Sequence, residues 1–318
     1  MNRNSYIYRF LKKCETPSEN SQFWLFMSTV YNICLLMIGR LLIAFECRKS
    51  STYVLVAPFS MGDALLLYRS FAELESTNSV DEPIVLSAPT LASVLTKLGL
   101  KNNRAIPPWR IMAISKALLF TPDRFPNVVL SQPWHFLDIQ HLNAETHLQS
   151  LPYTLSAETR KKLFPEPDMQ NRCIILSPYE QTYLSIGEPR LPMSFWEDLA
   201  EELTRRGYVV FTNCDGERET AIRNTRVFFP PLTELSGALD YAGNCISVRS
   251  GFTDWASSTQ TAKMVVLYPS ENFHALYRMD VMWEKMNVIE IIYDLSKLQE
   301  LHQKLIDSFS DTEYYENA

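Results

Sequence analysis

The sequence lacks the cysteine and histidine patterns that build metal sites. Its six cysteines are scattered without a CxxC pair, and its five histidines are equally dispersed. This argues against a structural zinc site and favours a reducing compartment. His135, Asp138 and His141 come nearest to a cluster. They lie in an aromatic segment that suggests packing, so we predict no metal site.

Outside the first fifty residues, acidic residues outnumber basic ones. The formal net charge is −6, and residues 1–50 carry seven Lys or Arg against three Glu, which is +4, so the remainder carries −10. A nucleic-acid binder needs a basic face on its folded part, and we therefore predict no nucleic-acid partner. An acidic body with a basic leader fits a body held near anionic lipid.

A long apolar run follows the basic leader. Residues 23–45 contain a single charge, Arg40, and Ser28, Asn32 and Arg40 fall roughly on one helical stripe. The run starts late and no small-residue cleavage site follows it, which argues against a signal peptide. We expect contact with a membrane surface through residues 23–45, either spanning it or lying on it. A helix buried against the body is the alternative.

The rest of the chain alternates strands and helices, which predicts parallel sheets with helices outside. Strands are expected at 53–58, 83–87, 127–131, 173–177, 208–212, 245–248, 264–268 and 288–293. Helices are expected at 64–75, 90–98, 111–120, 194–206, 234–242, 254–258 and 295–309. In the helix at 194–206, Ser194 and Glu197 match a capping box, and Gly207 closes the end.

A length of 318 residues is natural for two domains. Prolines and mixed charge mark residues 151–171 as the linker. We therefore expect a membrane-associating segment at 1–50, an N-terminal Rossmann-like domain at 51–165 and a C-terminal one at 166–318, with the active site in the cleft between them.

The segment at 245–268 is the most informative. An apolar strand ends in Arg249-Ser250-Gly251, a short helix follows, and a second apolar strand comes next. In open parallel sheets ligands bind at the carboxyl ends of strands, where N–H groups and an arginine suit a diphosphate. Arg249 is alternatively a partner in a salt bridge.

Three stretches resemble the two-domain GT-B glycosyltransferases, closest to the heptosyltransferase group (glycosyltransferase family 9) and related capsule and O-antigen transferases. They are VAPFSMGDALLL at 56–67, the segment from ILSPYE to GYVVFTN at 175–213, and ISVRSGFTDWASSTQTAKMVVLYP at 246–269. The group typically has Asp-Ser/Thr-Gly-x-x-His at the donor segment. Here the same spacing reads Arg249-Ser250-Gly251-Phe252-Thr253-Asp254.

The resemblance implies roles for particular residues. Asp63 matches the aspartate assigned as general base, although an Asp at a helix start is also a common N-cap. The donor diphosphate would be bound by residues from two loops, namely Ser177, Tyr179, Arg249, Ser250, Gly251, Thr253 and Asp254. Asn213, Asp215 and Gly216 either line the nucleotide or make a turn, and the turn is favoured.

The resemblance implies an inverting glycosyltransferase with no bound cofactor or metal, which uses a nucleotide-diphosphate sugar as co-substrate. Its acceptor would be a lipid-linked sugar or a polysaccharide, at the cytoplasmic face of the inner membrane. Two alternatives stay open. One is a non-catalytic GT-B-like scaffold, with which the low glycine count of nine is compatible. The other is a sugar-nucleotide epimerase. Such an enzyme needs no membrane contact, so the apolar segment at 23–45 argues against it.

Overall fold

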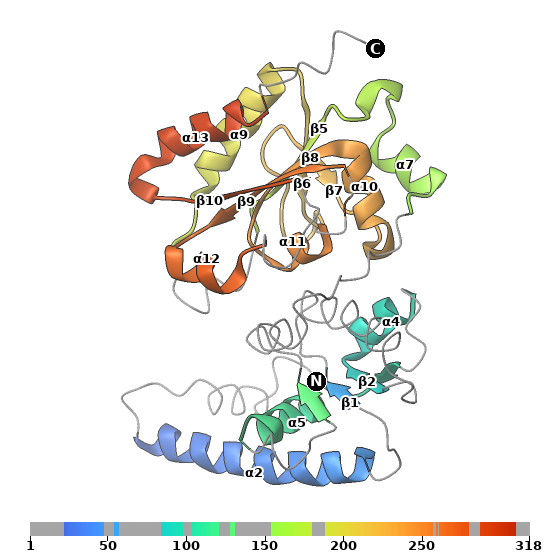
Figure 1. Ribbon diagram of the computed structural model, residues 1–318, viewed down its shortest axis with the longest axis vertical. Coiled ribbons are helices and arrows are strands. Elements are labelled where there is room, and N and C mark those ends of the chain that lie inside the picture. Colours follow the sequence, from blue (N-terminus) through green and yellow to red (C-terminus); the bar gives the residue numbers. More distant parts are fainter. Residues whose placement is uncertain are drawn as a thin grey trace. The chain divides into compact units, whose positions relative to one another are not determined.

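The computed structural model describes residues 22–47, 54–56, 84–97, 103–120, 128–130, 154–179, 188–256, 259, 261–279 and 287–309. It divides into two compact units, Met1–Glu145 and Thr146–Ala318 (Figure 1). Each unit contains one parallel sheet with helices packed on it. The expected α/β class with parallel sheets is therefore confirmed. The expected boundary at 165/166 and the cleft between domains stay predictions.

The first unit holds a four-stranded sheet. Its strands are β1 (Val54–Val56), β2 (Ile84–Ser87), β3 (Asn103–Ala105) and β4 (Val128–Leu130). They lie in the order β3-β2-β1-β4, and every pair is parallel. Central β1 therefore lies between β2 and β4. The segment that follows β1, which includes the expected helix at 64–75, lies outside the described residues.

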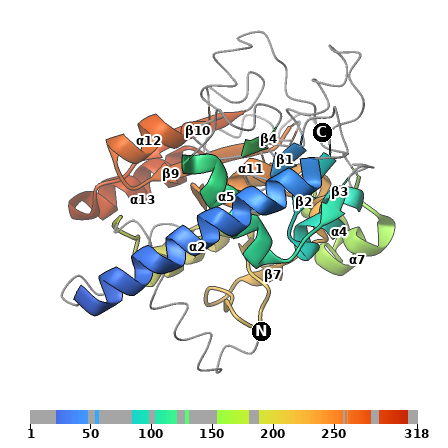
Figure 2. The ribbon, with the colours of Figure 1, turned by 90° about the horizontal axis from the view of Figure 1, so that it is seen from below.

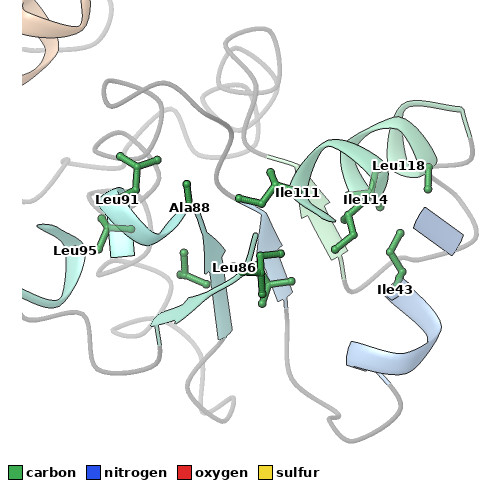
Figure 3. Packing of buried hydrophobic residues seen from close by; sticks show 11 residues of the cluster. Ile43, Leu86, Ala88, Leu91, Leu95, Ile111, Ile114 and Leu118 are labelled. Atoms are coloured by element: carbon green, nitrogen blue, oxygen red, sulfur yellow. The ribbon is translucent and has the colours of Figure 1, made fainter. Parts of the chain in front are cut away.

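Three helices accompany this sheet: α2 (Gln22–Cys47), α4 (Pro89–Lys97) and α5 (Pro108–Phe120). Side chains from all three meet those of β2 in one apolar cluster, which Figure 3 shows around Leu86. Ile43 of α2 is 1% exposed and belongs to this cluster together with Ile111 and Ile114 of α5. The apolar N-terminal segment is therefore a helix, and one face of its C-terminal half packs on the core.

The second unit holds a six-stranded sheet. Its strands are β5 (Cys173–Ser177), β6 (Val209–Asn213), β7 (Arg226–Phe228), β8 (Gly243–Val248), β9 (Lys263–Tyr268) and β10 (Val288–Ile292). All neighbours are parallel, in the order β10-β9-β8-β5-β6-β7. Along the chain, β6 and β7 are thus added in turn on one side of β5, and β8, β9 and β10 are added in turn on its other side. This is the strand order of a dinucleotide-binding Rossmann fold.

The helices of this unit are α7 (Ala157–Leu163), α9 (Met193–Arg205), α10 (Leu235–Ala242), α11 (Gly251–Ala256), α12 (Glu271–Tyr277) and α13 (Leu298–Asp307). Figure 1 shows the α9–α13 pair and α10 on opposite sides of the sheet. Both faces are covered, so β5 is buried along its whole length and carries apolar side chains on both faces.

Two sequence expectations are wrong in detail. Helix α9 begins at Met193 with Pro192 as N-cap and has no side-chain cap, so Ser194 lies inside the helix and forms no capping box. Gly207 does end this helix, with a φ of 88° that favours glycine. Helix α11 begins at Gly251, three residues before its expected start.

The expected linker at 151–171 also differs. It contains α7 and a 3-10 helix, η2 (Pro167–Met169). The Ser156 hydroxyl accepts the N–H of Thr159, which caps α7, and donates to Glu234 Oε2 at 2.9 Å. The Phe164 ring lies 5.5 Å from that of Phe211. Residues 154–171 are therefore a packed part of the second unit, in spite of their prolines.

Candidate functional site

The candidate site lies where the strand order of the six-stranded sheet reverses. Strands β5 and β8 are neighbours there, with Ser177 paired in register with Ser247. The connection after β5 leads to β6 on one side, and the connection after β8 leads to β9 on the other. Connections that diverge in this way leave a crevice at the carboxyl ends of the two strands, where ligands bind in open α/β sheets.

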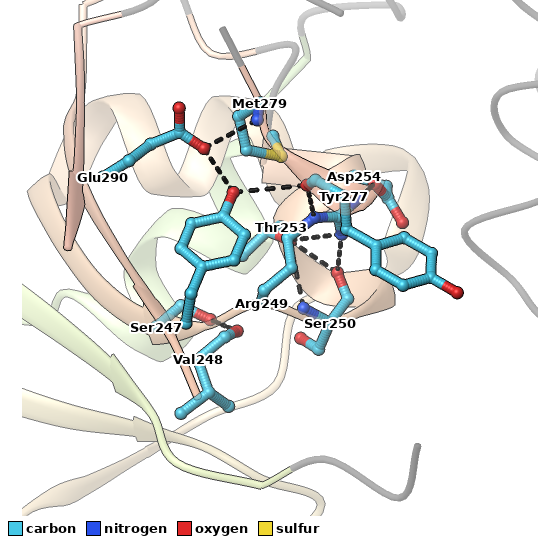
Figure 4. Close-up of polar contacts among 10 residues, drawn as sticks. Ser247, Val248, Arg249, Ser250, Thr253, Asp254, Tyr277, Met279 and Glu290 are labelled. Carbon is cyan, nitrogen blue, oxygen red and sulfur yellow. Dashed lines mark hydrogen bonds and ion pairs between the residues drawn. The ribbon is translucent and has the colours of Figure 1, made fainter. Parts of the chain in front are cut away.

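Arg249 directly follows β8, and its side chain is 7% exposed. Its guanidinium Nη2 lies 2.6 Å from Asp254 Oδ1 of α11. Nη1 donates to the Ser250 carbonyl at 2.9 Å and to the Thr253 hydroxyl at 2.8 Å, and Nε donates to the Tyr277 carbonyl at 2.8 Å. Figure 4 shows these contacts converging on one side chain. Arg249 thus joins β8, α11 and the end of α12.

The turn between β8 and α11 is closed by Thr253. Its hydroxyl donates to the Ser250 carbonyl at 2.6 Å and accepts the Ser250 N–H at 3.2 Å. The Ser250 hydroxyl, by contrast, is buried and finds no hydrogen-bond partner within the described part of the chain. A buried polar group without a partner costs free energy, which a water, an ion or a ligand that bonds to it can recover.

Further polar groups fix the position of the Tyr277 carbonyl, which accepts from Arg249 Nε. The Tyr268 hydroxyl, at the end of β9, donates to the Tyr277 carbonyl at 3.3 Å and bonds to Glu290 Oε1 of β10. Glu290 Oε1 also accepts the Met279 N–H at 2.7 Å, and its Oε2 lies 3.7 Å from Nε2 of His274. The end of β9, the middle of β10 and the segment after α12 are thereby held together (Figure 4).

The connection after β5 contributes Ser177 and Tyr179. Asn213, the last residue of β6, donates through Nδ2 to the Ser177 hydroxyl at 3.0 Å. The Tyr179 hydroxyl donates to the Thr220 carbonyl at 2.5 Å, and burial raises the pKa of this phenol. Tyr179 therefore ties the connection after β5 to the one after β6.

Asp215 organises the connection after β6. Its Oδ1 accepts three backbone N–H groups, from Arg218 at 2.8 Å, Glu217 at 2.9 Å and Glu219 at 3.2 Å. These bonds lower the pKa of the carboxyl, and the bond from Arg218 has the largest effect. Asp215 and Gly216 therefore lie in a tight bend, as the favoured interpretation predicts, whereas contact with a nucleotide stays an open alternative.

The predicted donor residues of the second unit lie at one edge of one sheet. Ser177 and Tyr179 follow β5, whereas Arg249, Ser250, Gly251, Thr253 and Asp254 follow the neighbouring β8. Asp63 lies outside the described residues, so its role stays a prediction. Sequence reasoning missed Tyr277, which contacts Arg249, and Glu290, which bonds to Tyr268, because nothing near them in the sequence signals these contacts.

The described cysteines are free, and burial raises the pKa of Cys173 to about 12, which keeps this core thiol protonated. Within the described residues no group of three or more His, Cys, Asp or Glu is placed to hold a metal ion.

No family model matches the chain, and a search of curated proteins finds no match. Among solved structures, the E. coli heptosyltransferase WaaC with ADP matches with a TM-score of 0.51 and 12% identity, over 81% of this chain and 98% of that one. WaaC with ADP-2-deoxy-2-fluoro heptose matches over the same shares, with a TM-score of 0.48 and 11% identity. The chain therefore has a fold similar to that of a heptosyltransferase, as its motifs predicted.

Proposed function

We propose that this protein is a glycosyltransferase that uses a nucleotide-diphosphate sugar. Its acceptor would be a lipid-linked sugar or a polysaccharide, in the biosynthesis of lipopolysaccharide, O-antigen or capsule. One observation carries the proposal: the turn that holds Arg249 and the unpartnered Ser250 hydroxyl lies at the reversal point of a Rossmann-ordered sheet. The likeness to a heptosyltransferase crystallised with ADP supports it.

The donor diphosphate would bind at the carboxyl ends of β5 and β8. Ser177 and Ser250 offer hydroxyl groups there, and the turn at Gly251, which the Thr253 hydroxyl closes, offers backbone N–H groups. Arg249 supplies the positive charge, which it shares with Asp254, and it holds the turn in shape. We propose that this arrangement, rather than a divalent cation, offsets the charge of the departing diphosphate.

Sugar transfer also needs a base near the acceptor, and we propose Asp63 for this role. Its carboxylate would take the proton of the acceptor hydroxyl as that oxygen bonds to the anomeric carbon. The bond from the anomeric carbon to the diphosphate breaks, and the nucleoside diphosphate leaves with the electron pair. Attack from the side opposite the leaving group inverts the anomeric centre. This chemistry requires the two units to face each other across a cleft.

The proposal also includes a location at the membrane. Residues 23–45 would hold the protein on the cytoplasmic face of the inner membrane, where nucleotide sugars and lipid-linked acceptors meet. The basic leader and the acidic body, at +4 and −10, favour this placement of the N-terminal segment against anionic lipid.

The first test is thermal unfolding of the full chain with UDP, GDP, ADP, dTDP and CMP. A selective ligand at a hundredfold excess over its dissociation constant stabilises the protein by about 2.7 kcal/mol. We expect one nucleotide to raise the melting temperature, and EDTA to leave that rise unchanged. The variant Ser250→Ala should weaken this nucleotide roughly tenfold or more, because a hydrogen bond to a charged group contributes about 1.5–3 kcal/mol.

The matched control is Ser308→Ala. Lys263, at the start of β9, bonds to the Ser308 carbonyl, so Ser308 lies at the opposite edge of the same sheet. This control should keep the full nucleotide response, and Asp63→Asn should keep it as well, because Asp63 is proposed to act on the acceptor. If no nucleotide stabilises the folded protein, the donor site is wrong and the scaffold alternative takes its place.

A further inference from the structure

Helix α2 exposes a face without a single charge. Between residues 26 and 45, the exposed positions are Phe26, Thr29, Val30, Ile33, Cys34, Met37, Ile38, Leu41, Ala44 and Phe45. Leu41 is 72% exposed and Phe45 is 69% exposed. A helix on the surface of a water-soluble domain places charged and polar residues on its outer face. By length and composition the stretch Phe26–Phe45 also qualifies as a candidate membrane span, and only 17% of it is buried.

The opposite face of α2 is seated on the first unit. Leu35, Gly39 and Ile43 are buried, and Figures 1 and 2 both show α2 crossing α5, against which it packs. The approach at Gly39 is so close that an added Cβ would lie 2.0 Å from the Ala113 carbonyl oxygen. The helix is therefore fixed side-on to the unit that carries the four-stranded sheet.

The polar stripe of α2 borders this seated face. Ser28, Asn32 and Arg40 are all half-buried, and Asn32 Nδ2 donates to the Ser28 carbonyl at 2.9 Å within the helix. The stripe thus points neither into the core nor to the centre of the outer face. The outer face is left wholly to uncharged side chains along a helix length of roughly 30 Å.

A spanning orientation conflicts with this packing. The C-terminal half of the candidate span, from Leu35 at its middle to Ile43 near its end, is docked on α5 and the core. Sinking them into hydrocarbon would take an open sheet with edge strands β3 and β4 into the bilayer. Edge strands carry unpaired backbone N–H and C=O groups, and lipid offers these groups no hydrogen bonds.

We infer that α2 lies in the plane of an anionic membrane surface, with its outer face among the acyl chains and its inner face on α5. This deepens the membrane contact of the proposed function without resting on sugar transfer. A second copy of the chain is the competing occupant of the face. Charge disfavours a dimer, because residues 51–318 of each copy carry a net charge of −10 and two such bodies repel each other. Residues 1–50, which contain α2, carry a net charge of +4 and attract anionic headgroups.

The test is co-sedimentation of the full chain, without nucleotide, with phosphatidylcholine vesicles and with vesicles that also contain phosphatidylglycerol. We expect binding to the mixed vesicles and release by alkaline carbonate, which leaves spanning helices in place. Phe45→Glu should lower vesicle partitioning roughly tenfold or more, since a buried Phe contributes strongly to transfer from water. Phe229→Glu is the matched control, because Phe229 is 59% exposed on the second unit, and it should bind as the wild type does.

Three outcomes would overturn the inference. Carbonate-resistant pelleting would indicate a spanning helix. Equal vesicle binding by Phe45→Glu and the wild type would show that this face does not meet lipid. A dimer that forms in the absence of vesicles and is lost in Phe45→Glu would show that a second copy of the chain covers this face. The nucleotide response of Phe45→Glu should equal that of the wild type, so a failed donor site and a failed membrane face are told apart.

Discussion

The guanidinium of Arg249 and the carboxylate of Asp254 form an ion pair of 2.6 Å in which each side chain is less than 10% exposed. The two residues sit on either side of the turn between β8 and α11 (Figure 4). A pair this buried is sensitive to loss of one partner, because the remaining charge then has neither water nor a counter-charge. The pair thus links the stability of the second unit to the geometry of the proposed donor site.

Arg249→Ala and Asp254→Ala are each expected to lower the free energy of unfolding by about 3–5 kcal/mol. The double variant should lose clearly less than the sum, because removing both charges leaves neither unpaired. Urea denaturation of the four proteins of this cycle measures the coupling. Strictly additive losses would mean that the two charges do not depend on each other.

Arg226→Ala is the matched control for this cycle. Arg226 Nη1 lies 2.8 Å from Glu166 Oε2, a similar distance, but the side chains are 47% and 50% exposed. Solvent screens such a pair and competes for its hydrogen bonds, so its loss should be far smaller than that of the buried pair. A comparable loss at both places would contradict the role given to burial.

Glu290 is the second prediction. Its Oε1 serves both the Tyr268 hydroxyl and the Met279 N–H, and Tyr268 also bonds to the carbonyl that holds Arg249 Nε. Glu290→Ala should destabilise the protein by roughly 1–3 kcal/mol, the cost of leaving buried donors without an acceptor. Glu290→Gln keeps an acceptor oxygen and should recover most of this loss in urea denaturation. Equal losses for the two variants would show that packing, rather than hydrogen bonding, accounts for the effect.

Central strands were predictable because apolar runs specify them directly. The runs at 173–177 and 264–268 gave β5 and β9 almost to the residue. Edge strands carry no such signal: β3 reads Asn-Arg-Ala, is largely exposed, and becomes a strand only because β2 pairs with it. The Asn103 side chain then binds Ser87 and the Ala92 carbonyl, which are contacts made by the fold.

The residues of the turn between β8 and α11 were predictable from the sequence, whereas the contacts that this turn makes with other elements were not. Arg249, Thr253 and Asp254 lie within six residues, so the pattern at one strand end identified them together. Tyr277 comes from α12 and Glu290 from β10. The neighbouring positions of β8, β9 and β10 in the sheet bring Tyr277 to Arg249 and Glu290 to Tyr268. Sequence spacing does not encode such contacts, and they depend on sheet order.

Asp215 gives a prediction about pH. Its carboxyl pKa is lowered by backbone N–H groups that favour the charged form. A folded-state pKa below that of the unfolded chain contributes stability that is present above the unfolded value of about 3.9 and is lost as the pH falls through the folded value. The unfolding free energies of wild type and Asp215→Asn should therefore differ at neutral pH and converge on acidification below pH about 4. A difference that stays constant with pH would contradict this assignment.

The sign of the change in unfolding free energy caused by Gly39→Ala tests whether α2 packs closely on α5. In an exposed helix, alanine is more stable than glycine by about 1 kcal/mol. Here the new Cβ would meet the Ala113 carbonyl oxygen at 2.0 Å and the Ala117 Cβ at 2.9 Å, so we expect a net loss of about 1–3 kcal/mol from overpacking. Urea denaturation followed by circular dichroism measures it. The control Ala44→Gly, at an exposed position of the same helix, should lose only the propensity difference.

The sign matters for the membrane inference as well. If Gly39→Ala is neutral or stabilising, α2 does not lie tightly on α5, and the argument against a spanning helix loses its basis. If Gly39→Ala destabilises the protein while Phe45→Glu does not, the two faces of α2 have separate roles: one face holds the helix on the protein, and the other is available to lipid. Phe45 is 69% exposed, so its substitution should leave the unfolding free energy nearly unchanged.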